Sequence, residues 1–155
     1  MTDATLIHTV TLEQIAEALR KAGYRAQVST VDGRSVVQSA AQGLGFIITS
    51  GNAAATPPNS FADFTFNCLI RVEGELQRAA VEAWNRKKRF GRMYFDRDLL
   101  VLAVDVLVAG GISQSSLVAH CELWDRLLHD LIAHLKTARV AVSAKPVTSA
   151  EVAPA

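Results

Sequence analysis

The residues best suited to metal or nucleophilic chemistry are three histidines and two cysteines. His120, His129 and His134 fall within one predicted helix, but they form no H-E-x-x-H motif, and the step from His129 to His134 separates these two around the helix. We interpret the histidines as solvated or paired with nearby acids. Cys68 and Cys121 lie far apart without C-x-x-C spacing, so neither a zinc site nor a disulfide framework is indicated. We interpret both as reduced thiols in the core.

One acid is of interest because it interrupts an apolar stretch. Asp105 is the only charged residue in the segment Leu99 to Val108. A carboxylate in such a segment must be paired, hydrogen bonded or exposed at an edge. We predict that Asp105 is a structural partner of a basic residue such as Arg89 or Arg92, in preference to an active-site acid.

The glycine-bearing segments do not have the spacing of a nucleotide-binding loop. Gly43-Leu44-Gly45 and Gly110-Gly111 match neither the phosphate loop nor the dinucleotide fingerprint, and they indicate turns. No catalytic constellation emerges from these residue types and spacings. We therefore expect a protein that is not an enzyme and that uses no cofactor and no metal.

A cluster of cations beside aromatic residues could bind an anionic partner. Such a mixture can hold phosphate and stack bases, which makes a nucleic-acid-binding regulator the alternative function. In the other interpretation, the cations complement the dipole of a helix that ends there, and the aromatic residues belong to the core. We favour the second, because no basic stripe elsewhere extends the cluster. Its residues are Arg86, Lys87, Lys88, Arg89 and Arg92, beside Trp84, Phe90 and Tyr94.

The composition is that of one folded domain. The 155 residues are 50% hydrophobic and 20% charged, and 16 Lys and Arg against 15 Asp and Glu give a net charge of +1. Such a balance argues against a general nucleic-acid or membrane-surface protein. Residues 1–14 do not read as a secretory signal, and the longest apolar stretch, Leu99 to Ala109, is too short to span a bilayer as a helix. We expect a cytoplasmic protein.

The patterns predict an α+β fold. Thr11 and Gln14 have the spacing of a capping box, and Gly23 suits a helix end. The first helix is followed by strands Ala26 to Thr30, Ser35 to Ala41, Leu44 to Ser50 and Asp63 to Arg71, then a helix from about Glu73 to Arg86 with Trp84 in the core. A hairpin of Phe90 to Asp96 and Leu99 to Val108 precedes a last helix that is capped by Ser113 and ends near Thr137. Residues 1–10 form an N-terminal extension, 11–137 the domain, and 138–155 a disordered tail.

Two apolar surfaces predict a partner. The last helix carries a seam of Leu117, Cys121, Trp124, Leu128, Leu131 and Leu135. The strand from Leu99 to Val108 is apolar on both faces, so we expect that Leu100, Leu102 and Val104, or their alternates, cannot all be covered within one chain. The surplus surface predicts a homodimer, or a site for a protein or peptide client. Neither a membrane nor a nucleic acid is the expected partner.

The chain resembles the YbjN family from roughly Leu12 to Leu135, most clearly from Trp84 onward. The resemblance rests on the spacing of Trp84-Asn85-Arg86, Arg89-Phe90, Tyr94, Asp105 and Gly110-Gly111-Ile112-Ser113 before a long apolar helix. It implies a fold similar to the type III secretion chaperones, with an antiparallel sheet of five to six strands, helices packed on it, and the order α-β-β-β-β-α-β-β-α. Members are described as bacterial sensory transduction regulators.

Together these features predict a protein-binding module, chaperone- or adaptor-like, in bacterial regulation or signalling. The candidate binding residues are Trp84, Asn85, Arg86, Arg89, Phe90, Tyr94, Leu102 and Asp105. A nucleic-acid-binding regulator and a small-molecule sensor remain alternatives, and the sensor requires an enclosed pocket of mixed polarity.

Overall fold

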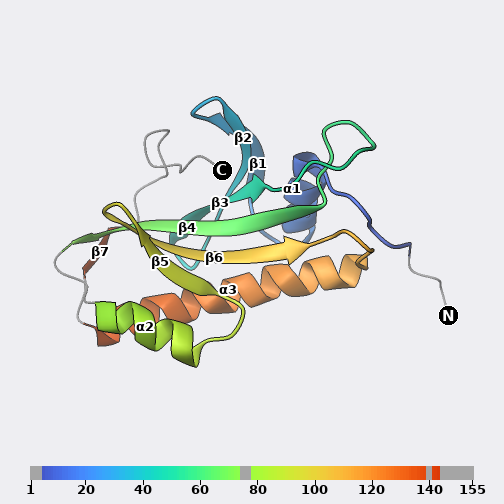
Figure 1. The fold of residues 1–155 in the computed structure, drawn as a ribbon. Helices are drawn as coiled ribbons and strands as arrows, with labels where there is room; N and C mark the ends of the chain where they lie inside the picture. The colour runs from blue at the N-terminus through green and yellow to red at the C-terminus, as the bar shows by residue number, and fades with distance from the viewer. Residues whose placement is uncertain (1–4, 74–77, 139–140, 144–155) are drawn as a thin grey trace.

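One antiparallel sheet and three helices make up the described part of the chain (Figure 1). The computed structural model describes residues 5–73, 78–138 and 141–143. The elements are α1 (Leu12–Lys21), β1 (Ala26–Val31), β2 (Arg34–Ala41), β3 (Leu44–Ser50), β4 (Asp63–Glu73), α2 (Arg78–Lys87), β5 (Arg92–Asp96), β6 (Leu99–Leu107), α3 (Gln114–Thr137) and β7 (Ala141–Ser143). The predicted α+β class and element order are confirmed.

The strands follow the order β1-β2-β3-β4-β6-β5, and β7 pairs with the end of β4. Strands β1 to β4 pair in chain order, and the β5–β6 hairpin is added to them because β6 pairs with β4. The strands β1 and β5 therefore lie at the two ends of this order and form edges of the sheet. The turn between β1 and β2 has positive φ at both central residues, 54° at Asp32 and 75° at Gly33. That is the two-residue turn that an Asp-Gly pair favours, and it fixes the register of the hairpin.

The capping box of α1 is present. The Gln14 amide donates to Thr11 Oγ1 at 3.1 Å, and the Thr11 amide donates to Gln14 Oε1 at 2.9 Å. The helix that follows buries Leu12, Ile15, Ala16, Ala18 and Leu19.

The helices cover one face of the sheet, which we call the helix face. Alternate residues of β4, among them Phe64 and Phe66, pack with the predicted seam of α3, whose six residues are all buried. Phe66 stacks on Trp124 with ring centroids 5.3 Å apart. In Figure 1, α3 runs the length of β6, and α2 lies near the C-terminal end of α3.

The opposite face, which we call the open face, has a smaller apolar cluster of Val31, Val36 and Ile47, with Leu69 packed against it. No helix residue belongs to that cluster among the residues that the structure describes.

The expectation that β6 leaves surplus apolar surface is wrong. Leu100, Leu102 and Val104 are 1%, 0% and 4% exposed under the helices, and on the open face Leu99 and Val101 are also buried. The reason is the position of β6 between two strands, since Val101 faces Leu69 on β4 and Tyr94 on β5. A homodimer, if it forms, must use another surface.

Several predicted boundaries also shift. Glu73 belongs to β4 and not to the second helix, and Leu76, which the helical spacing places on the buried face of that helix, lies outside the described residues. Phe90 precedes β5, which begins at Arg92. The expectation of a disordered tail is wrong for residues 141–143, which form β7, and residues 144–155 lie outside the described part. None of the described helices has the length and apolar character needed to cross a membrane.

Candidate functional site

Two of the candidate binding residues lie in the core. Trp84 and Leu102 are both 0% exposed, so neither can touch a partner directly. The indole Nε1 of Trp84 donates to the carbonyl oxygen of Gly91 at 3.1 Å. Trp84 thereby ties α2 to the loop that leads into β5, and it positions the surface residues that follow.

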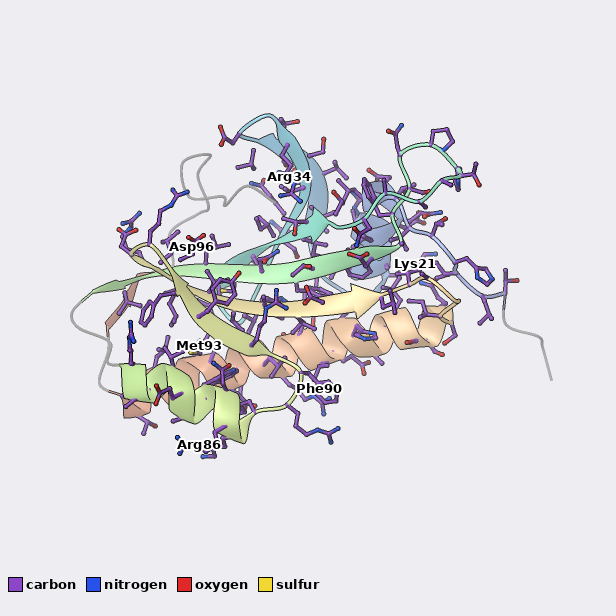
Figure 2. All side chains as sticks on the ribbon, in the orientation of Figure 1. Lys21, Arg34, Arg86, Phe90, Met93 and Asp96 are labelled. Atoms are coloured by element: carbon purple, nitrogen blue, oxygen red, sulfur yellow. The ribbon has the colours of Figure 1, made fainter. Side chains whose placement is uncertain are left out.

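Asn85 joins α2 to the edge of β5. Its Nδ2 donates to the carbonyl oxygen of Met93 at 2.8 Å, and its Oδ1 accepts from the Met93 amide at 2.8 Å. Both main-chain groups that Met93 turns away from the sheet are thus satisfied by one side chain. Figure 2 shows Met93, which belongs to β5, beside α2.

Phe90 is held at the apex of a tight turn. Its φ is +74°, and the Gly91 amide donates to the Arg89 carbonyl oxygen at 2.9 Å across it, which makes a strained γ-turn. Gly91 is packed closely, because a Cβ there would lie 3.2 Å from methyl carbons of both Leu102 and Leu127. The turn leaves Phe90 63% exposed, at the loop labelled in Figure 2. The favoured interpretation, which places the aromatic residues of the cluster in the core, is therefore wrong for Phe90 and Tyr94, although it is confirmed for Trp84.

Two arginines lie over exposed aromatic rings. The guanidinium carbon of Arg89 is 4.9 Å from the Phe90 ring centroid, and that of Arg92 is 5.9 Å from the Tyr94 ring. Tyr94 is 39% exposed. We call Arg89, Phe90, Arg92 and Tyr94 the Arg–aromatic patch. In pairs of this kind the ring quadrupole attracts the cation and favours its place over the ring.

Asp105 anchors the patch to the open face. Its carboxylate forms an ion pair with Arg92 and accepts from the hydroxyl of Thr65 at 2.6 Å. The prediction that Asp105 pairs with Arg89 or Arg92 is confirmed for Arg92. Partial burial tends to raise the pKa of Asp105, but the hydrogen bonds from Thr65 and Arg92 and the charge of Arg92 outweigh it and lower the pKa. The carboxylate is therefore charged at neutral pH.

The cations of residues 86–92 divide into two groups. Arg92 pairs with Asp105, and Lys88 pairs with Asp130 at 3.1 Å, where Nζ also lies 5.6 Å from the Trp84 ring centroid. Arg86, Lys87 and Arg89 are exposed and have no acidic partner among the described residues. The end of α2 and the Phe90 turn therefore carry an excess of positive charge.

Sequence reasoning missed Thr65 and the role of Gly91. Thr65 faces Asp105 because β4 pairs with β6, and that pairing joins segments 40 residues apart. Its position on the polar side of an alternating strand was the available signal. The glycine directly after Phe90 was the signal for a tight turn.

The two cysteines are buried, and two of the three histidines of the last helix contact main-chain carbonyl groups, whereas His129 is exposed. Burial raises the pKa of Cys68 to about 12; burial, and then the charge of Glu122, raise that of Cys121 to about 11, so both thiols remain protonated at neutral pH. His134 Nε2 lies 2.7 Å from the carbonyl oxygen of Ala80, and His120 Nδ1 lies 2.8 Å from that of Ser116. Within residues 5–73, 78–138 and 141–143, no group of three or more His, Cys, Asp or Glu could hold a metal ion.

A cavity of mixed polarity lies between α1 and the start of α3. It has a volume of about 220 Å³ and is lined by Ile7, Val10, Gln14, Glu17, Ala18, Lys21, Gln114 and Leu117. Ligand sites are usually larger, from about 300 Å³. This cavity is therefore a weaker candidate site than the Arg–aromatic patch.

A comparison with protein families finds one match that covers most of the chain. The model of YbjN, described as a putative bacterial sensory transduction regulator, matches residues 11–137. No curated protein and no solved structure matches the chain.

Proposed function

The chain belongs to the YbjN family, which supports a regulatory or signalling role in general terms, and within that role we propose that it is a non-enzymatic protein-binding module. In this proposal, the Arg–aromatic patch contacts the partner. The module is adaptor- or chaperone-like, because it acts by holding another polypeptide.

The exposed, strained turn at Phe90 is the observation that carries this proposal. A non-glycine residue at φ +74° costs free energy, and such conformations cluster at ligand-binding sites. A large aromatic ring that is 63% exposed gains little from folding, so its burial by a partner is the compensating interaction. Aromatic residues and arginines are also the residue types that dominate binding energy at protein interfaces.

The rigidity of the turn favours binding further. Gly91 packs against Leu102 and Leu127, and Trp84 holds the Gly91 carbonyl, so the ring is presented from a fixed backbone. Arg89 already lies over the Phe90 ring. Little side-chain freedom is then lost when the partner binds, and this raises the affinity that the same contacts can provide.

The charges define the chemistry of the partner. Arg86, Lys87 and Arg89 meet no acid in the described part of the chain, so an acidic segment with an apolar residue fits this surface. The apolar residue packs on Phe90, and the carboxylates meet the guanidinium groups of Arg86 and Arg89.

The experiment compares two substitutions of exposed apolar residues. Partners captured from a native lysate by the wild-type chain are identified by mass spectrometry, purified and titrated calorimetrically against wild type, Phe90→Ala and Leu107→Ala. Leu107 is 68% exposed near the end of β6 and lies outside the patch, so it is the matched control. We expect Phe90→Ala to weaken binding by about tenfold or more and Leu107→Ala to leave it within about twofold. Equal binding of Phe90→Ala and wild type would reject the patch as the site.

The same cations support a second candidate function, the binding of nucleic acid. Three exposed cations without acidic partners lie beside two exposed aromatic rings, a mixture that suits a single strand. Titration with a single-stranded oligonucleotide at several salt concentrations tests it. Binding that weakens steeply with salt, with a shallower slope after Arg86 and Lys87 are both changed to Gln, would favour this function over the first.

A further inference from the structure

The two edge strands of the sheet are protected to different degrees. On β5, the Asn85 side chain forms hydrogen bonds with both main-chain groups of Met93 that point away from the sheet, the amide and the carbonyl. On β1, Arg20 Nε donates to the carbonyl oxygen of Ala26 at 2.9 Å, which protects the first residue of the strand. Within the described part of the chain, the remainder of β1 has no comparable contact.

The turn geometry shows which main-chain groups of β1 point outward. In a two-residue hairpin, the residues that flank the turn, Val31 and Arg34, form a hydrogen-bonded pair, and the pairs alternate from there. Val28 and Thr30 therefore turn their amide and carbonyl groups away from β2, as Ala26 does. Among the described residues, these groups of Val28 and Thr30 have no hydrogen-bond partner.

The sequence of β1 also lacks the usual protection of an edge. The six residues from Ala26 to Val31 include no charge and no proline, although edge strands commonly carry Lys, Pro or a bulge that prevents pairing. Val28 is 39% exposed, and Thr30 is exposed as well. This strand is therefore open to the addition of another strand.

We propose that β1 pairs antiparallel with β1 of a second copy of the chain, about a two-fold axis at Val28, to form one continuous sheet across a homodimer. In this register Val28 faces Val28 of the second copy, and Ala26 faces Thr30 of the second copy. Each outward amide then meets a carbonyl oxygen, since the outward groups of both strands are at the same alternate positions. The Ala26 carbonyl oxygen, which has two lone pairs, accepts from Thr30 of the second copy in addition to Arg20 Nε.

The charges around β1 favour a second copy as the occupant. The register places Arg25, just before β1, opposite Val31 of the other copy and one residue away from Asp32 of that copy, and both charged residues are exposed. The charges of α1, which packs beside β1, are balanced as two ion pairs, Arg20 with Glu13 at 2.9 Å and Lys21 with Glu17 at 3.6 Å. The two-fold pairing therefore brings opposite charges together and adds no like-charge repulsion from α1.

The first test is the mass of the chain in solution. Light scattering coupled to gel filtration should give two chains for the wild type and one chain for Val28→Lys, because the axis places the two ammonium groups directly opposite. Phe95→Lys is the matched control: it changes a residue that is 40% exposed on the opposite edge strand, and it should remain a dimer. Circular dichroism establishes that each variant is folded. A wild-type mass of one chain at all concentrations, or a Val28→Lys variant that stays dimeric, would overturn the proposal.

A cysteine variant tests the register. Val28→Cys should form a disulfide between chains under mild oxidation, because residues paired in this way lie about 5.5 Å apart at Cα, within the range of a disulfide. The two native cysteines are buried and do not compete. Thr30→Cys should not cross-link, since it faces Ala26 of the second copy. Cross-linking through Thr30→Cys but not through Val28→Cys would show that the register is wrong. This proposal does not rest on the Arg–aromatic patch, and either can fail alone.

Discussion

The side chain of Asn85 pairs with the main chain of Met93 as a neighbouring strand would. Its amide donates to and accepts from Met93 at 2.8 Å in both directions, at the outer edge of β5. This single residue fixes α2 against β5 and satisfies the two outward groups of that edge strand at Met93. The Phe90 turn lies between these two elements, so the Asn85 contact also sets the position of the Arg–aromatic patch.

We expect Asn85→Ala to destabilise the fold by about 1 to 3 kcal/mol, because it leaves both outward groups of Met93 without a partner. Urea unfolding followed by circular dichroism measures this change. Arg86→Gln, the neighbouring substitution on the same helix, removes an exposed charge and should cost less than about 0.5 kcal/mol. Equal stability of the two variants would show that the Asn85 contact is unimportant in solution.

Trp84→Ala should be the most damaging substitution in this region, at about 3 to 5 kcal/mol. The side chain is fully buried, and its removal leaves a cavity and an unpaired Gly91 carbonyl oxygen. The double change of Arg86 and Lys87 to Gln is the control, and it should unfold close to wild type. If Trp84→Ala unfolds like the parent but no longer binds a partner, then Trp84 is a contact residue and not a core residue.

The elements with local signals could be predicted from the sequence. The Thr11–Gln14 capping box marks the start of α1, and the Asp32-Gly33 pair marks the first hairpin, because each depends on residues only one to three positions apart. The alternation of apolar and polar residues in β4 and the apolar seam of α3 could be predicted for the same reason, because each pattern lies within one strand or one helix. Asp105 and Arg92 lie on β6 and β5, which are consecutive strands of one hairpin. A short turn already brings these two strands together.

The parts that depend on distant segments could not be predicted. Thr65 contacts Asp105 only because β6, which pairs with β5 along one side, also pairs with β4 along the other, and nothing near either residue specifies that second pairing. The burial of Val101 has the same cause, since it requires Leu69 and Tyr94 on two different strands. The exposure of Phe90 depends on how tightly Gly91 packs on Leu127 of α3, which is also a tertiary contact.

The ion pair of Asp105 predicts a specific pH dependence. Its pKa is lowered in the folded protein, so its contribution to stability is present above the unfolded pKa of about 3.9 and is lost as the pH falls through that value and through the lower folded pKa. Because the two side chains are 57% and 52% exposed, the contribution is below about 1 kcal/mol. Wild type should therefore melt slightly above Asp105→Asn at neutral pH, and the difference should shrink as the pH falls below about 3.9 and vanish only below the lower folded pKa. A difference that is unchanged at low pH would mean that charge is not its source.

The substitution Phe90→Gly separates stability from binding. At φ +74°, glycine is unstrained, whereas alanine and phenylalanine are not, so Phe90→Gly should be more stable than Phe90→Ala by about 1 kcal/mol. For a chain of this length, that difference corresponds to about 2 to 4 °C in melting temperature. Alanine is the proper reference, because both variants remove the ring and only the backbone preference differs between them.

The same two variants should bind the partner equally poorly, since neither has the ring that packs on its apolar residue. Stability and affinity then change independently, as expected when a strained residue is kept for a contact that forms only in the complex. Thermal melting and calorimetric titration of the purified pair measure both. If Phe90→Gly is no more stable than Phe90→Ala, the turn is not strained. If Phe90→Gly binds like wild type, the ring at the apex of the turn is not the contact.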